Sequence, residues 1–320
     1  MKLGVIGEPC IDYIYRGSIS HEKQFGGILY SVVSLAVISA KSAEVYPIMN
    51  LGEDEYESIA AFLNKFRNIK TDFINKSQHK TRVVNLYYKD SSSALNTSTK
   101  KTYDREENST EPTLPVEFKQ IKGALENLDG ILINMVSGND ITLDTLKKIR
   151  ENFTGYIHMD LHNLVMKTFP DGTRKQIPVK DWLNWCRMCD TLQMNESEIA
   201  ILTGDSAPEN ETAEEILKKS KIKSVVVTRG ERGATLYEPK RKEKGGKRFK
   251  LDKTDVCLIK NIEFADSTGC GDVFASGFFF KSIEKNLNEF TESLHFANKM
   301  AGLNASLKGV EELNKLNDGT

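Results

Sequence analysis

The sequence predicts an α/β fold with a doubly wound, mostly parallel central sheet and helices on both faces, and two observations lead to it. Short apolar runs recur along the 320 residues, and they lack the polar alternate positions of a half-exposed strand. Amphipathic stretches with apolar residues at helical spacing lie between these runs. Strands that alternate with helices in this way form a parallel sheet that is covered on both faces.

The expected strands are short and apolar, at residues 2–7, 43–49, 130–136, 155–161, 190–194 and 223–228. The expected helices are amphipathic, at residues 28–40, 56–66, 143–152, 196–204 and 212–220. Two further helices, starting at Asp272 and near Asn288, close the chain. We therefore expect residues 1–320 to form one α/β domain.

Two segments interrupt this alternation. Residues 81–115 mix β-forming residues with a polar, low-complexity run, which indicates exposed strands and a loop. With residues 11–25 they are expected to form a small β lid over the cleft. Residues 238–250 are rich in Lys and Arg, and we interpret them as a solvated hairpin tip turning at Gly245 and Gly246. A phosphate or nucleic-acid patch is the alternative for this basic segment.

Composition excludes several classes of protein. A formal net charge of −1 lacks the basic excess of nucleic-acid and membrane-surface binders. No apolar stretch reaches the roughly 18 residues that span a bilayer. The N-terminal run MKLGVIGEPC predicts a first strand rather than a signal peptide. Five cysteines, an odd number, indicate a reducing compartment without a disulfide framework, so the cytoplasm is the expected location.

One pair of cysteines has the spacing of metal ligands. Cys186 and Cys189 lie in WLNWCRMCD, but no second pair of cysteines or histidines completes a zinc set. We interpret both as small buried thiols of a helix, and we expect no structural metal.

The stretch ADSTGCGDVFASGFFF, at residues 265–280, has the features of an anion site. Gly269 and Gly271 bracket Cys270, and Asp272 follows at the start of an apolar run of helical length. Such glycines weaken a fold unless the backbone must approach something closely. A glycine turn that opens a helix directs several backbone N–H groups and the positive end of the helix dipole to one point. We therefore expect an anion there, although Asp272 also fits an ordinary first-turn acid.

Polar residues follow two more of the expected strands. Asn195 and Glu198 come directly after the strand that ends at Met194, and Thr228 and Gly230 come after the VVV run. Ligands of open α/β sheets bind at the carboxyl ends of the strands, so these residues are candidates for a site. Each also has a simpler interpretation, which is a helix cap for Asn195, a solvated helix residue for Glu198 and a turn for Thr228 with Gly230.

Two nucleotide-binding patterns are excluded. No glycine-rich loop ends in Gly-Lys-Ser or Gly-Lys-Thr, so the chain has no P-loop. The N-terminal GVIGEP carries Pro9 where the dinucleotide pattern requires glycine or alanine.

Taken in order, the motifs resemble those of the ribokinase-like (PfkB) family of carbohydrate and nucleoside kinases, nearly from end to end. The stretches that carry the resemblance are GEPCID (7–12), FGG (25–27), LGED (51–54), NESE (195–198), DSTGCGD (266–272), and AN (297–298) with Ala301 and Gly309. The fifth of these fits the C-terminal signature of the family, which is usually written Asp-Thr-x-Gly-Ala-Gly-Asp.

The resemblance implies the catalytic residues. Asp272 would be the base that accepts the proton of the acceptor hydroxyl. The amides of Gly269, Cys270 and Gly271 would stabilise the charge on the transferred phosphoryl group. Their place at a helix N-terminus predicts a low pKa for the carboxyl of Asp272 and a lowered pKa for the thiol of Cys270.

The resemblance also implies the nucleotide side. Asn195 and Glu198 would hold Mg²⁺ through water, with Glu198 as the metal-binding residue. Thr228 and Gly230 would line the nucleotide, and Asn298 would lie in the helix beside the adenine. The implied cofactors are ATP and Mg²⁺, and the family is also compatible with a monovalent cation such as K⁺.

On the acceptor side, the resemblance implies that Asp12, Gly26 and Gly27 hold the hydroxyls of the acceptor. Ser31 occupies the position where the family often has an asparagine that contacts the sugar. The family's Asp-Pro-Asn becomes DLHN at residues 160–163, one residue longer, so Asn163 is not assigned to the site. Both departures concern the acceptor, and both leave the catalytic end intact.

These implications describe an ATP- and Mg²⁺-dependent kinase acting on a hydroxyl of a small sugar or sugar derivative. A nucleoside acceptor and a catalytically silent ligand-binding module of the same fold are the alternatives. An NAD-dependent oxidoreductase shares the strand and helix order but needs the missing dinucleotide pattern. The expected partner is a small molecule rather than nucleic acid or membrane. The family often pairs its lid sheets into a homodimer, but residues 81–115 offer no clear apolar edge for this.

Overall fold

The structure is a computed structural model that describes residues 1–16, 21–88, 105–169, 174–240, 249–257 and 264–319. Within these residues, nine strands form one sheet in the order β15-β14-β13-β12-β9-β8-β1-β4-β5. Their bounds are β1 (Lys2–Ile6), β4 (Glu44–Gly52), β5 (Ile74–Ser77), β8 (Gly130–Asn134), β9 (Tyr156–Asp160), β12 (Thr191–Asn195), β13 (Ser224–Thr228), β14 (Ala234–Pro239) and β15 (Leu251–Val256). All neighbours from β13 to β5 pair in parallel, and β14 and β15 add an antiparallel edge. The predicted α/β fold with a mostly parallel sheet is confirmed.

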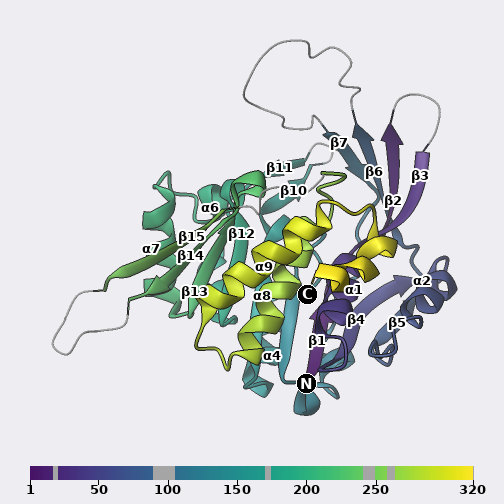
Figure 1. The fold of residues 1–320 in the computed structure, drawn as a ribbon, viewed down its shortest axis with the longest axis horizontal. Helices are drawn as coiled ribbons and strands as arrows, with labels where there is room; N and C mark the ends of the chain where they lie inside the picture. The colour runs from purple at the N-terminus through teal and green to yellow at the C-terminus, as the bar shows by residue number, and fades with distance from the viewer. Residues whose placement is uncertain (17–20, 89–104, 170–173, 241–248, 258–263, 320) are drawn as a thin grey trace, which may run out of the picture.

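Helices cover both faces of this sheet. Figure 1 shows α1, α8 and α9 side by side over one face. The helix bounds are α1 (Leu29–Ser39), α2 (Tyr56–Leu63), α3 (Phe118–Ile121), α4 (Leu143–Asn152), α5 (Trp182–Arg187), α6 (Glu196–Leu202), α7 (Glu209–Ser220), α8 (Cys270–Glu284) and α9 (Phe290–Asn304). Short 3₁₀ helices are η2 (Leu125–Asn127), η3 (His162–Val165), η4 (Gly230–Arg232) and η5 (Val310–Gly319). Each end given in the sequence analysis for a strand of the main sheet or for a helix lies within three residues of the observed end.

The alternation of side chains along the strands divides the core into two layers. Leu3 and Val5 of β1 pack with α1, α8 and α9, whereas Ile6 packs on the opposite face with α4, α6 and α7. All three side chains are fully buried. This two-sided burial explains why the strands read as continuous apolar runs.

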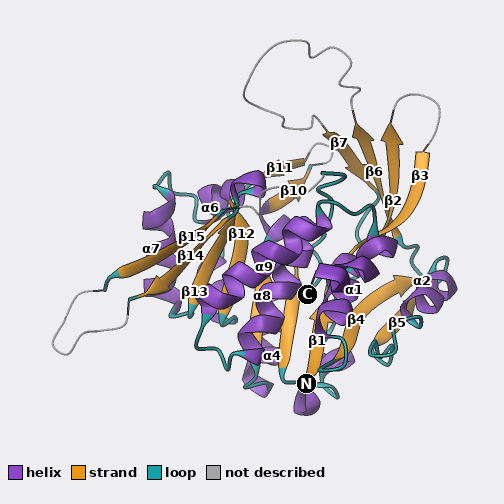
Figure 2. Ribbon diagram, viewed as in Figure 1, coloured by secondary structure: helices purple, strands orange, loops and turns teal. Residues whose placement is uncertain are grey.

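A second sheet stands beside the carboxyl ends of the main strands. It has the order β3-β2-β6-β7, and Figure 2 shows its four strands extending away from the main sheet. Its strands are β2 (Pro9–Arg16), β3 (His21–Gly27), β6 (Arg82–Tyr88) and β7 (Arg105–Ser109). We call this sheet the lid sheet. A hairpin of β10 (Met166–Thr168) and β11 (Arg174–Gln176) follows β9 and reaches the lid sheet through an ion pair between Arg174 and Glu107.

Three expectations need comment. The predicted turn at Gly245 and Gly246 lies outside the described residues, between the paired strands β14 and β15. Cys186 on α5 and Cys189 just after it are both buried in the core. In the described part of the chain, no helix is long and apolar enough to cross a membrane.

Candidate active site

The predicted anion site is a left-handed glycine turn that starts α8. Gly269 is the N-cap residue, with φ of 75°, and a Cβ there would lie 2.1 Å from Cδ1 of Tyr30. Only glycine fits this conformation against a ring packed so closely. At Gly271, by contrast, a Cβ would meet no atom within 4 Å. Gly269 is therefore packed tightly against Tyr30 of α1, whereas Gly271 faces open space.

The backbone amides of this turn are not all available to a ligand. The N–H of Cys270 donates to the carbonyl of Ser267 at 3.2 Å. The amides of Gly269 and Gly271 donate to no other group among the described residues. The anion-binding role predicted for three amides is thus better supported for the two glycines than for Cys270. Cys270 also contrasts with its predicted chemistry, because burial raises the pKa of its thiol to about 11.

Asp272 lies in the first turn of α8, where its side chain is half-buried. Its Oδ1 accepts hydrogen bonds from Nδ2 of Asn134 at 2.7 Å and from Oγ of Ser31 at 3.4 Å. Burial raises its pKa to about 7, although these hydrogen bonds act in the opposite direction. The sequence-based prediction of a low pKa is wrong, because loss of hydration outweighs the helix N-terminus. A carboxyl with a pKa near 7 is a better proton acceptor at neutral pH.

Adjacent strand ends bring the predicted nucleotide and metal residues together. Asn195 at the end of β12 is paired in register with Thr228 at the end of β13. The side chain of Asn195 caps α6, and the carboxylate of Glu198 accepts hydrogen bonds of 2.7 Å from the backbone amide and from Nδ2 of Asn195. The simpler interpretation of Asn195 as a helix cap is therefore confirmed. Glu198 is not a solvated residue, because it is only 6% exposed.

Glu198 belongs to a group of three carboxyls that are buried in full or in part. Burial raises the pKa of Glu198 to about 7, and burial together with the charges of Glu198 and Asp272 raises the pKa of Asp160 at the end of β9. Three carboxyls that resist ionisation together are stabilised by a cation between them. No set of three His, Cys, Asp or Glu side chains in the described chain is close enough to hold a metal directly. Carboxyl oxygens are donors of the kind that Mg²⁺ binds, and Mg²⁺ in proteins usually keeps several of its own waters.

A buried glutamine joins this acidic group to the glycine turn. Nε2 of Gln193 donates to Oδ2 of Asp160 at 3.1 Å and to the carbonyl of Gly271 at 3.0 Å. Gln193 therefore fixes the turn of α8 against the end of β9. Its role could not be predicted from the sequence, because one polar residue within the apolar run TLQMN carries no distinct signal.

The other predicted nucleotide residues lie at the same edge of the sheet. Gly230, with φ of 54°, begins η4 directly after β13 and has open space where a Cβ would stand. Asn298 on α9 is buried, and its Nδ2 donates to the carbonyl of Cys257 at 2.8 Å. Asn298 therefore holds the chain beyond β15. Gly309, expected in the last helix, lies beyond α9 and faces Gln24 of the lid sheet.

The predicted acceptor residues lie where the lid sheet joins the body. Asp12 lies on β2 of the lid sheet, within residues 11–25 that were expected to contribute to the lid, and is 6% exposed. A Cβ on Gly26 would stand 2.1 Å from Oδ2 of Asp12, and Gly27 has φ of 62° just before α1. Cys10 donates its S–H to Oδ1 of Asp12 at 3.1 Å. Ser31 is fully buried, and its hydroxyl donates a hydrogen bond to Oδ1 of Asp272 rather than facing an open pocket.

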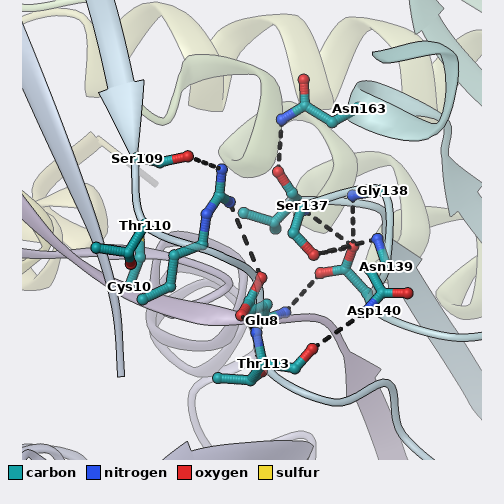
Figure 3. Close-up of polar contacts among 12 residues, drawn as sticks. Glu8, Cys10, Ser109, Thr110, Thr113, Ser137, Gly138, Asn139, Asp140 and Asn163 are labelled. Atoms are coloured by element: carbon teal, nitrogen blue, oxygen red, sulfur yellow. Dashed lines mark hydrogen bonds and ion pairs between the residues drawn. The ribbon is translucent and has the colours of Figure 1, made fainter. Parts of the chain in front are cut away.

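Glu8 joins the base of the lid sheet to neighbouring segments through its backbone and its carboxylate, and Figure 3 shows part of this network. Its amide donates to Oδ1 of Asp140 at 2.7 Å, and its carbonyl accepts from the amide of Ile28. Its carboxylate accepts from the amide of Thr113 and lies 3.9 Å from a guanidinium nitrogen of Arg82. Glu8 and Arg82 are each 3% exposed. These contacts join the chain segments that enter and leave the lid sheet to the loop after β8.

Asp140 is the second centre of this network. Its Oδ2 accepts from the amides of Ser137 and Gly138 and from the hydroxyl of Ser137. Burial and the charge of Glu8 raise its pKa to about 6. Asn163, to which no role was assigned, donates to the carbonyl of Val136 and so supports the same loop (Figure 3).

Comparison with known families decides what this arrangement is. The chain matches the family described as pfkB family carbohydrate kinase over residues 32–316. The chain belongs to the pfkB family of carbohydrate kinases. The resemblance inferred from the motifs is confirmed. Asp12, Gly26, Gly27 and Ser31 precede the matched region, so their assignment depends on the geometry above.

Solved structures share the fold of this pfkB kinase at low identity. Ribokinase from Thermotoga maritima has a TM-score of 0.71 at 18% identity, covering 99% of this chain and 98% of its own. Aminoimidazole riboside kinase from Salmonella enterica, complexed with aminoimidazole riboside and an ATP analogue, has 0.70 at 15% identity, covering 100% and 98%. A pyrophosphate-dependent kinase of the ribokinase family, complexed with a pyrophosphate analogue and myo-inositol, has 0.73 at 13% identity, covering 99% of each chain. A comparison with curated protein sequences gives no match.

Proposed function

We propose that this pfkB kinase transfers the γ-phosphoryl group of ATP to a hydroxyl of a small sugar or sugar derivative. The observation that supports it best is the arrangement around Asp272. A half-buried carboxyl with a pKa of about 7 lies in the same helical turn as the two unused amides of Gly269 and Gly271. A base and an anion site therefore lie together at the carboxyl ends of parallel strands, where ligands of such sheets bind.

In the proposed reaction, Asp272 accepts the proton of the acceptor hydroxyl while the oxygen of that hydroxyl attacks the γ-phosphorus. The bond from that phosphorus to the bridging oxygen breaks, and ADP leaves. The amides of Gly269 and Gly271 stabilise the charge on the transferred group. Most of the rate enhancement in phosphoryl transfer comes from positioning and charge stabilisation, which the buried contacts of Asp272 supply.

Asn195 and Glu198 would hold Mg²⁺, and Thr228 and Gly230 would line the nucleotide. Bound Mg²⁺ supplies positive charge that neutralises the donor phosphates. The three carboxyls described above support a cation at this place, because it would offset their mutual repulsion.

The lid sheet favours a sugar over a nucleoside. Side chains alternate between the faces of a strand, so Cys10, Asp12 and Ile14 share one face of β2. The stacked rings of Tyr15 and Tyr87, 4.6 Å apart, lie on the opposite face. On the Asp12 face, the two residues paired with Asp12 itself are Gln24 of β3 and Val84 of β6, and neither is aromatic. A nucleobase beside Asp12 would therefore have no ring at these paired positions to stack on.

The test is phosphorylation of a panel of sugars, polyols and nucleosides, with ATP and pyrophosphate as donors and the products detected by mass spectrometry. We expect transfer from Mg·ATP to a sugar. Transfer only to nucleosides would favour the nucleoside alternative, and transfer only from pyrophosphate would overturn the ATP assignment. Ligand binding without transfer to any acceptor would favour the silent module.

A further inference from the structure

Among the described residues, Asn134 makes the shortest side-chain hydrogen bond to the proposed base. It is the last residue of β8, paired in register with Asp160 of β9, and it is fully buried. Its Nδ2 donates to Oδ1 of Asp272 at 2.7 Å and to Oγ of Ser31 at 3.3 Å. Its own Oδ1 is buried and has no hydrogen-bond partner among the described residues.

A buried carbonyl without a partner costs free energy, of the order of 1–3 kcal/mol for such groups. An apolar residue at position 134 would avoid this cost, as the neighbouring apolar positions of β8 do. What the carboxamide supplies is the N–H bond to Asp272. The contact with Asp272 therefore explains why an asparagine occupies this position of an otherwise apolar strand.

The surroundings of Asp272 make this donor important. Within the described part of the chain, the titratable groups that interact electrostatically with Asp272 are Asp12 from the lid sheet, Asp160 from β9, Cys270 from its own turn and Tyr30 from α1. None of these carries positive charge, so none of them stabilises the carboxylate. Ser31 is the other side-chain donor to Asp272, and its 3.4 Å contact is long for a hydroxyl.

Both side-chain hydrogen bonds that Asp272 accepts from the described residues end on the same oxygen, Oδ1. We propose that Asn134 is a positioning residue for phosphoryl transfer, whose amide holds Oδ1 of Asp272 so that Oδ2 is left for the acceptor hydroxyl. This inference rests on the proposed function of Asp272 as the base. It assigns a role to a residue that does not touch the substrate.

The contact has two consequences. It fixes the rotation of the carboxylate, so its loss lowers kcat more than it alters the KM of the acceptor. It also stabilises the charged form, so its loss raises the pKa of Asp272 further. Because the base must be deprotonated, the acidic limb of the kcat–pH profile then moves to higher pH. A charge-assisted hydrogen bond of typical strength corresponds to a displacement of about one to two pH units.

The experiment compares wild type with Asn134→Leu, which is nearly isosteric and lacks the donor. Asn134→Ser is a second variant, which keeps a hydroxyl at this position. Ser31→Ala removes the longer contact to Asp272 together with the hydroxyl that accepts from Asn134. The Asp272 carboxyl is titrated by ¹³C NMR, with its resonance assigned by comparison with Asp272→Asn. The kcat–pH profile is measured on the acceptor that the panel identifies.

We expect Asn134→Leu to raise the carboxyl pKa and the acidic limb together by about one unit or more, with a smaller displacement in Ser31→Ala. We expect Asn134→Ser to lie between wild type and Asn134→Leu. An unchanged carboxyl pKa and pH profile in folded Asn134→Leu would overturn the proposal. So would a change confined to the KM of the acceptor. If Asn134→Leu does not fold, Asn134→Ser decides by the same two measurements.

The NMR titration separates this inference from the proposed function. A wild-type protein that phosphorylates nothing overturns the function. A carboxyl pKa that still depends on Asn134 would then support the contact, and one that does not would overturn it.

Discussion

Gly26 lies so close to Asp12 that a Cβ at position 26 would stand 2.1 Å from Oδ2 of the carboxylate. The two residues lie on paired strands of the lid sheet, where Gly26 is opposite Cys10, two residues before Asp12 on the same face. The absence of a side chain at Gly26 thus leaves room for the carboxylate that the acceptor is expected to meet.

Gly26→Ala should therefore displace Asp12 and raise the KM of the acceptor, with a smaller effect on the KM of ATP. Asp12→Ala should act in the same direction, because each lost charge-assisted hydrogen bond is worth roughly 1.5–3 kcal/mol, or about 10- to 100-fold. Steady-state kinetics in both substrates measures this. Glu22→Ala, an exposed acid on the neighbouring strand, is the control that should change neither KM. An acceptor KM unchanged in both site variants would place the acceptor elsewhere.

Much of the fold could be predicted from sequence because its signals are local. Runs such as KLGVI and SVVVT are apolar on both faces, and only a sheet covered on both sides buries them. Those strand ends also predicted that Asn195 and Thr228 would lie together, and the register confirms it.

The electrostatics of the site could not be predicted in the same way. The helix N-terminus of Asp272 is visible in the sequence, but its burial under α1 and β8 depends on residues far away in the chain. Asn134 and Ser31 are 138 and 241 residues distant from Asp272. A single asparagine at the end of GILIN gives no indication of that contact.

Glu198→Gln should raise the Mg²⁺ concentration that gives half-maximal rate, because it removes one negative charge beside the proposed cation. The rate as a function of Mg²⁺, at a fixed concentration of ATP, measures the effect. Glu196→Gln is a matched control in the same helical turn, since Glu196 pairs with Arg229 and Arg232 at the surface. If both variants have the Mg²⁺ dependence of wild type, Glu198 does not hold the metal.

Stability should depend on pH through Asp272. Because its pKa is about 7 in the folded protein and near 4 when unfolded, the folded state binds the extra proton between these values. Stability from this group is fully present below pH 4 and is lost as the pH rises through 7. Asp272→Asn removes the buried charge, so it should stabilise the protein at pH 8, by an amount on the order of 1–4 kcal/mol, and have little effect at pH 4.

Thermal unfolding of wild type and Asp272→Asn across this pH range measures the difference. Asp144→Asn, in the first turn of α4 and exposed, is the matched control, and it should show no such dependence. If the difference in stability between Asp272→Asn and wild type is the same at pH 4 and pH 8, the pKa of Asp272 is not raised in the folded protein.

The order in which the cysteines are labelled should be set by how deeply each is buried, not by the helix dipole. The raised thiol pKa of Cys270 keeps it protonated at neutral pH, and the thiolate is the reactive form. Cys257, which is exposed, should react first with iodoacetamide, and Cys10, Cys186 and Cys189 should react slowly. Mass-spectrometric mapping over time gives the order. Labelling of Cys270 before Cys257 would restore the sequence-based expectation of a lowered thiol pKa.

The central claim is that Asp272 is the base of a phosphoryl-transfer site, and Asp272→Asn tests it most directly. Asparagine preserves the shape and the bond from Asn134 but cannot accept the proton. The measurement is kcat on the acceptor found in the panel, alongside the Kd of Mg·ATP. We predict that kcat falls by orders of magnitude, about 10²-fold or more, while the Kd of Mg·ATP is retained. A kcat within tenfold of wild type would contradict the claim.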